Sequence, residues 1–105
     1  MENPWRGDVA LTLNGQRHVL RLTLGALAEL EASLGEQSLV GLVERFEGRS
    51  FSSVDVLELL GAGLKGGRCL FSKEDLAHAE IEGGPMAAAK AAAELLARAF
   101  VVPET

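Results

Sequence analysis

Several residue types are scarce in this sequence. Its 105 residues include no tyrosine, one cysteine and one tryptophan, and aromatic residues make up only 5% of the total. The single Cys69 cannot form an internal disulfide or, alone, a zinc site, which favours a reducing compartment. With so few aromatic residues, the core must consist mainly of Leu, Val and Ala, a composition more typical of helices than of a β-sandwich.

Long apolar runs and clusters of basic residues are also missing. No apolar run approaches the roughly 18 residues of a membrane span, and residues 1–6 are polar, without the apolar centre of a signal peptide. The net charge is −5, and the ten Lys and Arg residues are scattered. Nucleic-acid binding needs clustered cations, and anionic lipid repels an acidic surface. We therefore expect a cytoplasmic protein that binds neither nucleic acid nor membranes.

The clearest local pattern is a β-hairpin over residues 8–23. Apolar residues alternate with polar or small ones on both sides of Asn14-Gly15. The two central positions of a type I′ turn need positive φ, which Asn tolerates and Gly adopts freely. A two-residue turn here pairs Leu13 with Gln16 and fixes the register of the whole hairpin.

This register predicts two unlike faces. One face carries the apolar residues Val9, Leu11, Leu13, Leu20 and Leu22. The other face consists of the cross-strand pairs Asp8 and Arg21, Ala10 and Val19, and Thr12 and Arg17. The second face is therefore largely polar and includes an ion pair.

From residue 24 onward the apolar spacing becomes helical. It predicts five short helices over residues 24–34, 39–47, 53–64, 73–81 and 86–101. Ser52 with Asp55, and Ser72 with Asp75, have the spacing of capping boxes at two helix starts. The third helix is apolar around most of its circumference, Val54 included, so we expect it to be central.

The inward faces of the other helices follow from the same periodicity. For the first helix the predicted inward stripe is Leu24, Leu27, Leu30 or Glu31, and Leu34. For the last helix the predicted stripe is Met86, Ala89, Ala93, Leu96 and Phe100.

The fold class predicted from these elements is α+β, mainly α, in a single domain spanning residues 1–105. A two-stranded hairpin at residues 8–23 precedes a helical part at residues 24–101. We expect residues 1–6 to be disordered and residues 102–105 to form a tail.

Catalytic and cofactor motifs are weak throughout. Gly61, Gly63 and Gly66 match the letters of a dinucleotide-binding loop, but they follow a helix instead of preceding one. We interpret the glycines from Gly61 to Gly67 as a helix terminator and flexible joint. His18 and His78 have no nucleophile or carboxylate partner nearby in sequence, and no two metal ligands have a chelating spacing. We predict no enzymatic activity, no metal and no cofactor.

Residues 52–59 resemble the modification site of acyl carrier proteins. Ser53 would receive the phosphopantetheine, while Asp55 and Glu58 would supply an acidic recognition surface. Two features depart from that family: Ser52 stands where carriers have Asp, and a hairpin precedes where carriers have a helix. Helix capping alone also explains the pattern.

A broader resemblance covers roughly residues 7–100. Residues 7–15, 21–31 and 60–67 together resemble the small gene transfer agent tail protein family, which is grouped with phage tail assembly chaperones and sometimes described as tail tube protein. Arg68-Cys69 after the glycine pair, and the acidic segment at residues 80–82, depart from the usual pattern.

The resemblance implies a non-catalytic role in tail assembly. A tail assembly chaperone would bind the tape-measure protein before the tail tube polymerises, and it could contact other tail proteins or further copies of itself. The alternative is a structural component of the tail.

Partner binding is predicted at two places. A two-stranded hairpin is barely stable alone and exposes strand edges, which points to the face and edges around Ala10, Thr12, Arg17, Val19 and Arg21. The second place is the glycine-rich segment with Gly61, Gly63, Gly66 and Gly67. The alanine-rich last helix is a competing contact surface.

Overall fold

The computed structural model describes residues 8–34 and 39–99. It begins with the hairpin, in which strand β1 (Val9–Leu13) pairs antiparallel with strand β2 (Gln16–Leu20). Val9 lies opposite Leu20 and Leu13 opposite Gln16, so the predicted register is confirmed. Asn14 and Gly15 both have positive φ, at 51° and 79°, as the turn chemistry requires.

The two predicted faces of the hairpin are present. Val9, Leu11, Leu13 and Leu20 are buried in the core. On the other face Arg21 Nε lies 2.6 Å from Asp8 Oδ1, which confirms the predicted ion pair.

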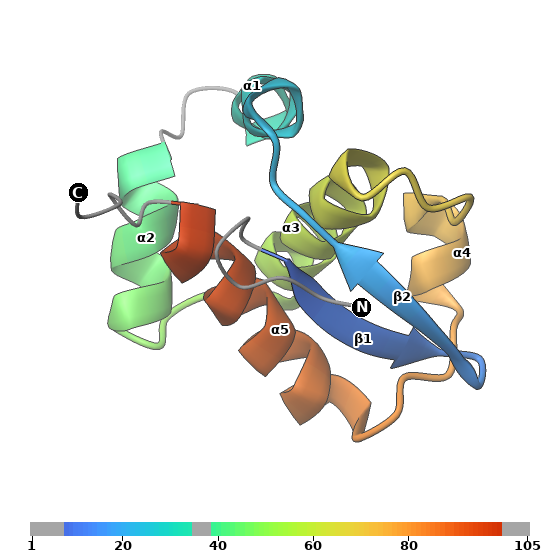
Figure 1. Ribbon diagram of the computed structural model, residues 1–105. Helices are drawn as coiled ribbons and strands as arrows, with labels where there is room; N and C mark the ends of the chain where they lie inside the picture. The colour runs from blue at the N-terminus through green and yellow to red at the C-terminus, as the bar shows by residue number, and fades with distance from the viewer. Residues whose placement is uncertain (1–7, 35–38, 100–105) are drawn as a thin grey trace, which may run out of the picture.

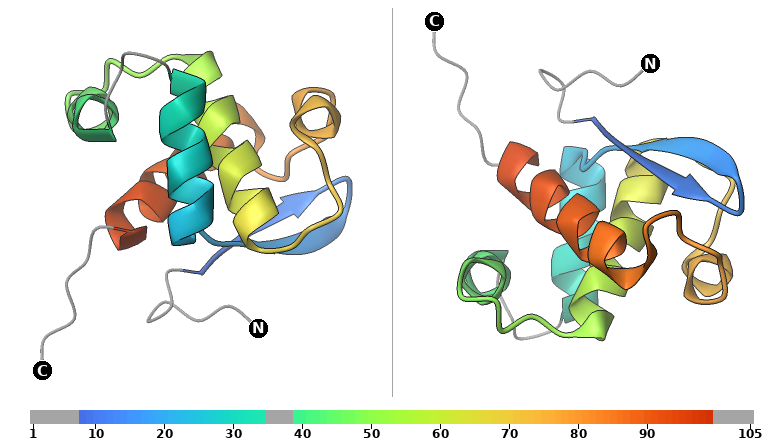
Figure 2. Two further views of the ribbon diagram at one scale, coloured as in Figure 1. Left: turned by 90° about the horizontal axis from the view of Figure 1, so that it is seen from above. Right: turned by 90° about the horizontal axis from the view of Figure 1, so that it is seen from below.

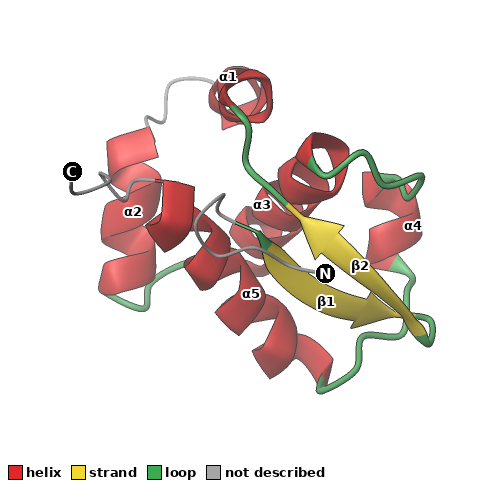
Figure 3. Cartoon of the chain, in the orientation of Figure 1, coloured by secondary structure: helices red, strands yellow, loops and turns green. Residues whose placement is uncertain are grey.

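Five helices follow, and the α+β, mainly α class is confirmed (Figure 3). They are α1 (Leu24–Leu34), α2 (Leu39–Glu47), α3 (Ser53–Gly66), α4 (Lys73–Ala77) and α5 (Gly84–Ala99). Helix α3 is central, because it packs against α1, α4, α5 and β2 (Figure 1). Helices α1 and α3 lie side by side, and α5 crosses beside β1 (Figure 2).

The helix starts form as the capping pattern predicts. The side chain of Ser52 accepts a hydrogen bond from the Asp55 amide at 3.1 Å, and the Asp55 carboxylate accepts one from the Ser52 amide at 2.9 Å. Ser72 and Asp75 make the same reciprocal pair at the start of α4. Both capping boxes are therefore confirmed.

The core is almost entirely aliphatic, and α5 contributes small residues to it. Its buried residues come from both strands and from every helix; the largest fully buried apolar side chains are Leu13, Leu20, Leu30, Leu42, Leu59, Leu60, Leu64 and Leu95. Ala88, Ala91 and Ala92 of α5 are buried as well, so this helix can approach the hairpin and α3 closely.

Four predicted inward positions are wrong. Leu24 is 84% exposed, Val54 is 64% exposed and Met86 is 80% exposed, and Ala93 of α5 is exposed as well. Leu24, Val54 and Met86 lie in the first turn of their helices, and periodicity alone does not reveal which positions of an apolar face are covered. In α5 the buried stripe is Ala88, Ala91, Ala92, Leu95 and Leu96, rotated from the predicted one.

Two predicted helix ends are also wrong. Helix α4 stops at Ala77 instead of continuing to Ile81, because Ile81 forms an antiparallel bridge with Leu13 of β1. Helix α3 does not fray at its glycines but continues through Gly66.

Some predictions lie outside the described residues: the disordered start at 1–6, the tail at 102–105, and the last helix beyond Ala99, including Phe100. Among the residues that are described, no helix is long and apolar enough to cross a membrane.

Candidate partner-binding site

The structure brings the two predicted partner-binding segments together, because the glycines of α3 lie against β2. A Cβ on Gly66 would lie 1.9 Å from the carbonyl oxygen of Arg21, and a Cβ on Gly67 would lie 2.2 Å from that of Val19. At Gly63 a Cβ would be 2.8 Å from Leu95 Cδ1. The helix does end among these glycines, with Gly67 as the C-cap of α3, as the terminator interpretation predicts. In addition, Gly63, Gly66 and Gly67 leave room for the backbone of β2 and of Arg21 to lie close to α3.

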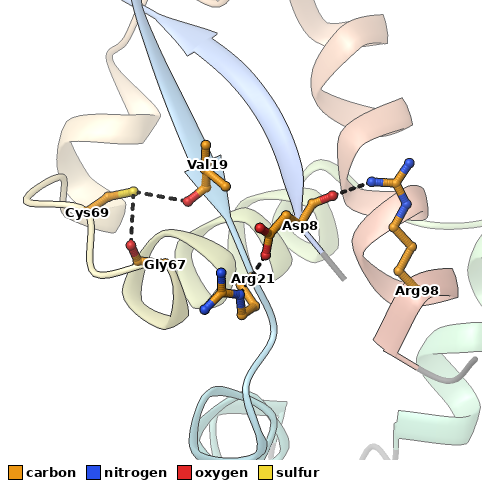
Figure 4. Close-up of polar contacts among 6 residues, drawn as sticks. All are labelled: Asp8, Val19, Arg21, Gly67, Cys69 and Arg98. Carbon is orange, nitrogen blue, oxygen red and sulfur yellow. Dashed lines mark hydrogen bonds and ion pairs between the residues drawn. The ribbon is translucent and has the colours of Figure 1, made fainter. Parts of the chain in front are cut away.

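This contact covers the outer edge of β2 at its C-terminal end, at Val19 and the following Arg21. The Arg21 amide donates a hydrogen bond to the carbonyl of Gly63 at 2.9 Å. The thiol of Cys69 carries one proton and has two carbonyl acceptors within reach, that of Val19 at 3.5 Å and that of Gly67 at 3.9 Å (Figure 4). Burial raises the pKa of the Cys69 thiol, which favours its protonated, donating form.

The outer edge of β1 is covered at its ends. The Glu82 amide donates to the Thr12 carbonyl at 3.1 Å, and the Asn14 amide donates to the Glu80 carbonyl at 2.8 Å. At the other end of the strand, the guanidinium of Arg98 donates to the carbonyl of Asp8 (Figure 4). Segment 80–82 thus pairs with the end of β1 as a short antiparallel strand would.

Between these ends, Ala10 and Thr12 line a shallow hollow of about 330 Å³ against α5. Its rim carries charges of both signs, from Glu82, Lys90 and Glu94. Among the described residues, the hydrogen bonds above occupy the two ends of the β1 edge, and the middle of the edge faces this hollow.

The hairpin residues predicted to bind a partner differ in exposure. Arg17 is exposed, whereas Ala10, Thr12 and Val19 are half-buried. Arg21 donates a hydrogen bond from Nε to the Asp8 carboxylate, and this bond raises the pKa of the Arg21 guanidinium. Arg17 is thus the member of this set that is most open to solvent.

Gly61 lies apart from the other glycines, in the wall of a larger groove of about 590 Å³. We call it the α1–α3 groove; helices α1, α3 and α4 and the segment 69–72 line it. Its apolar lining residues include Leu30, Ala62, Leu70 and Phe71. Its charged residues are Glu29, Glu58, Lys65, Lys73 and Asp75.

Ion pairs link the elements that line this groove. Lys65 Nζ lies 3.1 Å from Glu29 Oε1, and Lys73 Nζ lies 2.6 Å from Glu58 Oε1. Leu70, at the mouth of the groove, is fully exposed. Sequence reasoning missed this groove; the signal that could have found it is the apolar pair Leu70-Phe71 within a short connection between two helices.

The residues weighed for a carrier-type modification have other partners. Ser53 is the exposed first residue of α3. Asp55 is buried and binds Arg45 through both carboxylate oxygens, at 2.9 and 3.0 Å. The hydrogen bond from Arg45 holds the pKa of Asp55 below its ordinary value, although burial opposes this shift. Asp55 therefore joins α2 to α3 and is not a free surface acid.

The two histidines have different surroundings. The ring of His18 packs 5.2 Å from that of Phe71, and its buried Nε2 atom has no hydrogen-bond partner. His78 caps the exposed end of α4. Across residues 8–34 and 39–99, no group of three or more His, Cys, Asp or Glu side chains could hold a metal ion.

A family model described as "Phage tail tube protein, GTA-gp10" matches residues 6–101, which include all of the described fold. The chain belongs to this family. The resemblance to gene transfer agent and phage tail proteins is thereby confirmed, and the description names the tail tube instead of an assembly chaperone. No curated protein and no solved structure matches the chain. The family assignment makes this a tail protein.

Proposed function

We propose that this protein is a structural component of a gene transfer agent or phage tail and acts by binding other tail proteins, without catalysis. The observation that carries the proposal is the family match over residues 6–101. Since it extends from before β1 to beyond α5, the match concerns the whole fold and not one motif.

The surface of the chain is consistent with such a role. The α1–α3 groove and the exposed side chains Leu24, Val40 and Leu70 present apolar area to solvent. Of these three side chains Leu70 lines the groove, and exposed apolar groups of this kind are typical of protein–protein contacts. The proposed partners are other tail proteins, met in the cytoplasm of the cell where the particles assemble.

The test is to purify intact particles and quantify this protein in them by mass spectrometry. A structural component is expected at a fixed ratio to the other tail proteins, and it should stay with the particles through a density gradient. Particles that lack the protein, while the cell lysate contains it, would overturn the proposal.

A second candidate role is that of an assembly chaperone for the tape-measure protein, and one observation favours it. Much of both outer edges of the hairpin is covered by the chain itself, through Gly63 and Cys69 on β2 and through Glu82 on β1. Tubes built by adding strand to strand need open sheet edges. A covered hairpin suits a protein that shields a partner better than one that polymerises through its sheet.

Co-expression with the tape-measure protein separates the two roles. A chaperone should keep that protein soluble and co-purify with it before tubes form, and it should be absent from finished particles. A structural component should instead co-purify with assembled tails.

A further inference from the structure

We propose that the middle of the β1 edge binds an extended segment of another tail protein, which adds to the hairpin as a short strand beside Ala10. The inference rests on the proposed function, since the partner is taken from among the other tail proteins. It depends on backbone groups without a partner, on the strand pairing already present at one end of this edge, and on the hollow between β1 and α5.

The backbone groups of Ala10 point away from β2. In an antiparallel hairpin with a two-residue turn, the pair that closes the turn, here Leu13 and Gln16, exchanges both hydrogen bonds, and such pairs then alternate along the ladder. Leu11 therefore also bonds to β2. Ala10 and Thr12 instead direct their N–H and C=O groups outward, toward α5 (Figure 1).

Some of the outward groups of β1 are already bonded. The Thr12 carbonyl accepts from the Glu82 amide at 3.1 Å, and the Asp8 carbonyl accepts from Arg98. Within the described part of the chain, no hydrogen bond reaches the N–H or C=O of Ala10 or the N–H of Thr12. Two donors and one acceptor thus stand in a row at a sheet edge, the arrangement that recognises the backbone of an extended chain.

The chain itself shows which kind of occupant fits this edge. Ile81 forms an antiparallel bridge with Leu13, so residues 80–82 already lie along β1 as a strand would. The same pairing, continued, would reach the place opposite Ala10. The chain instead turns away at Gly83, where φ is +88°, and enters α5. A strand from a partner can therefore pair where this segment leaves the edge.

The hollow against α5 provides room for the side chains of an added strand. Its volume is about 330 Å³, and Ala10, Ala87 and Ala91 give it a lining of small residues. Glu82 and Lys90 at its rim are exposed, and neither makes an ion pair among the described residues. A segment with small apolar side chains, flanked by charges of both signs, is complementary to this lining and rim.

The experiment begins with an array of short overlapping peptides that cover the other tail proteins of the particle and this chain itself, probed with the full chain. A peptide that binds is then added to the isotope-labelled full chain, and amide exchange is followed by NMR. In the free protein the amides of Ala10 and Thr12 should exchange faster than that of Leu11, which bonds to β2. The peptide should slow the exchange of Ala10 and Thr12 by about 10-fold or more.

Two changes to the backbone test the geometry. Ala10→Pro removes the outward N–H but no bond to β2, so it is expected to weaken peptide binding by about 10-fold or more. Met86→Asp is the control, because Met86 is exposed and does not line the hollow. In the peptide, N-methylation should abolish binding at alternate residues only, since alternate amides face β1. This last comparison uses the unaltered protein and so does not depend on the folding of a variant.

Three results would overturn the inference: no peptide binds, Ala10→Pro leaves binding unchanged, or N-methylation shows no alternation. Binding by peptides of this chain alone would also overturn it, because the partner would then be a second copy. Particles that contain the protein at a fixed ratio, while no peptide binds this edge, would overturn this inference and leave the proposed function standing.

Discussion

The carbonyl oxygen of Arg21 occupies the position where a side chain on Gly66 would have to begin, 1.9 Å from an ideal Cβ. The contact joins the residue that follows β2 to the last turn of α3, and the hydrogen bond from the Arg21 amide to the Gly63 carbonyl holds the two segments together. Adding even one methyl group at Gly66 would therefore disturb the packing between β2 and α3.

Gly66→Ala is therefore expected to destabilise the protein by about 2–4 kcal/mol, because β2 must shift away from α3. Gly61→Ala is the matched control in the same helix. The atoms nearest to a Cβ there are methylenes of the Lys73 side chain, from 3.4 Å, which is an ordinary contact. It should raise stability by up to about 1 kcal/mol through helix propensity. Urea unfolding monitored by circular dichroism measures both, and equal effects of the two substitutions would contradict the contact.

The two capping boxes should differ in strength. Asp55→Ala removes a cap and both bonds to Arg45, so we expect a loss of about 2–4 kcal/mol. Asp75→Ala removes a cap from the shorter α4, where the carboxylate is exposed, and should cost about 1 kcal/mol. Thermal unfolding of the two variants gives the comparison; similar losses would mean that the Arg45 contact contributes little.

The Arg45 contact also predicts a dependence on pH. The folded state holds the pKa of Asp55 below its ordinary value, with the hydrogen bond from Arg45 as the largest cause. The contribution is therefore complete above the unfolded pKa of about 3.9 and is lost as pH falls through the lower folded pKa. Asp55→Asn should unfold with a weaker dependence on pH in this acid range than the unaltered protein does. Parallel curves for the two proteins would contradict this assignment.

Cys69 reports on the contact between α3 and β2. Because burial raises the pKa of its thiol, little thiolate is present near neutral pH and iodoacetamide should react several-fold more slowly than with the urea-unfolded chain. Mass spectrometry of the single cysteine follows the reaction. In Gly66→Ala, where β2 is displaced, alkylation should be faster; an unchanged rate would place the protection elsewhere.

His18 offers a stabilising substitution. Its buried Nε2 has no hydrogen-bond partner, and a buried polar atom without a partner costs free energy. His18→Phe removes that atom and keeps an aromatic ring against Phe71, so it should raise the free energy of unfolding by about 1 kcal/mol. The exposed His78, changed in the same way, should alter stability by less than about 0.5 kcal/mol. A lower melting temperature for His18→Phe would contradict the assignment.

The hairpin and the helix starts could be predicted from sequence because their signals are local. The turn at Asn14-Gly15 sets the register, and each Ser-x-x-Asp pattern satisfies amides within its own turn. The exposure of Leu24 and Met86 could not be predicted, because periodicity defines an apolar face but not how far the neighbouring elements extend along it.

The glycines of α3 show why the candidate site was harder to predict. Gly63 and Gly66 are three residues apart, so they share one face of the helix. The same letters are typical of a helix terminator, which they also form, and only the position of β2 reveals the close backbone contact. The α1–α3 groove depends on three elements and a connection that are separate in sequence, so no local pattern predicts it.

The placement of α5 beside β1 has a consequence for the order of folding. The hairpin is made first and its turn closes locally, but Ala88, Ala91 and Ala92 of the last described helix form part of the core that covers its leucines. Arg98 reaches the Asp8 carbonyl across 90 residues of chain. A nascent chain that lacks α5 therefore exposes an apolar sheet, which invites aggregation. The hairpin can therefore bury its apolar face in the native core only after α5 has been synthesised.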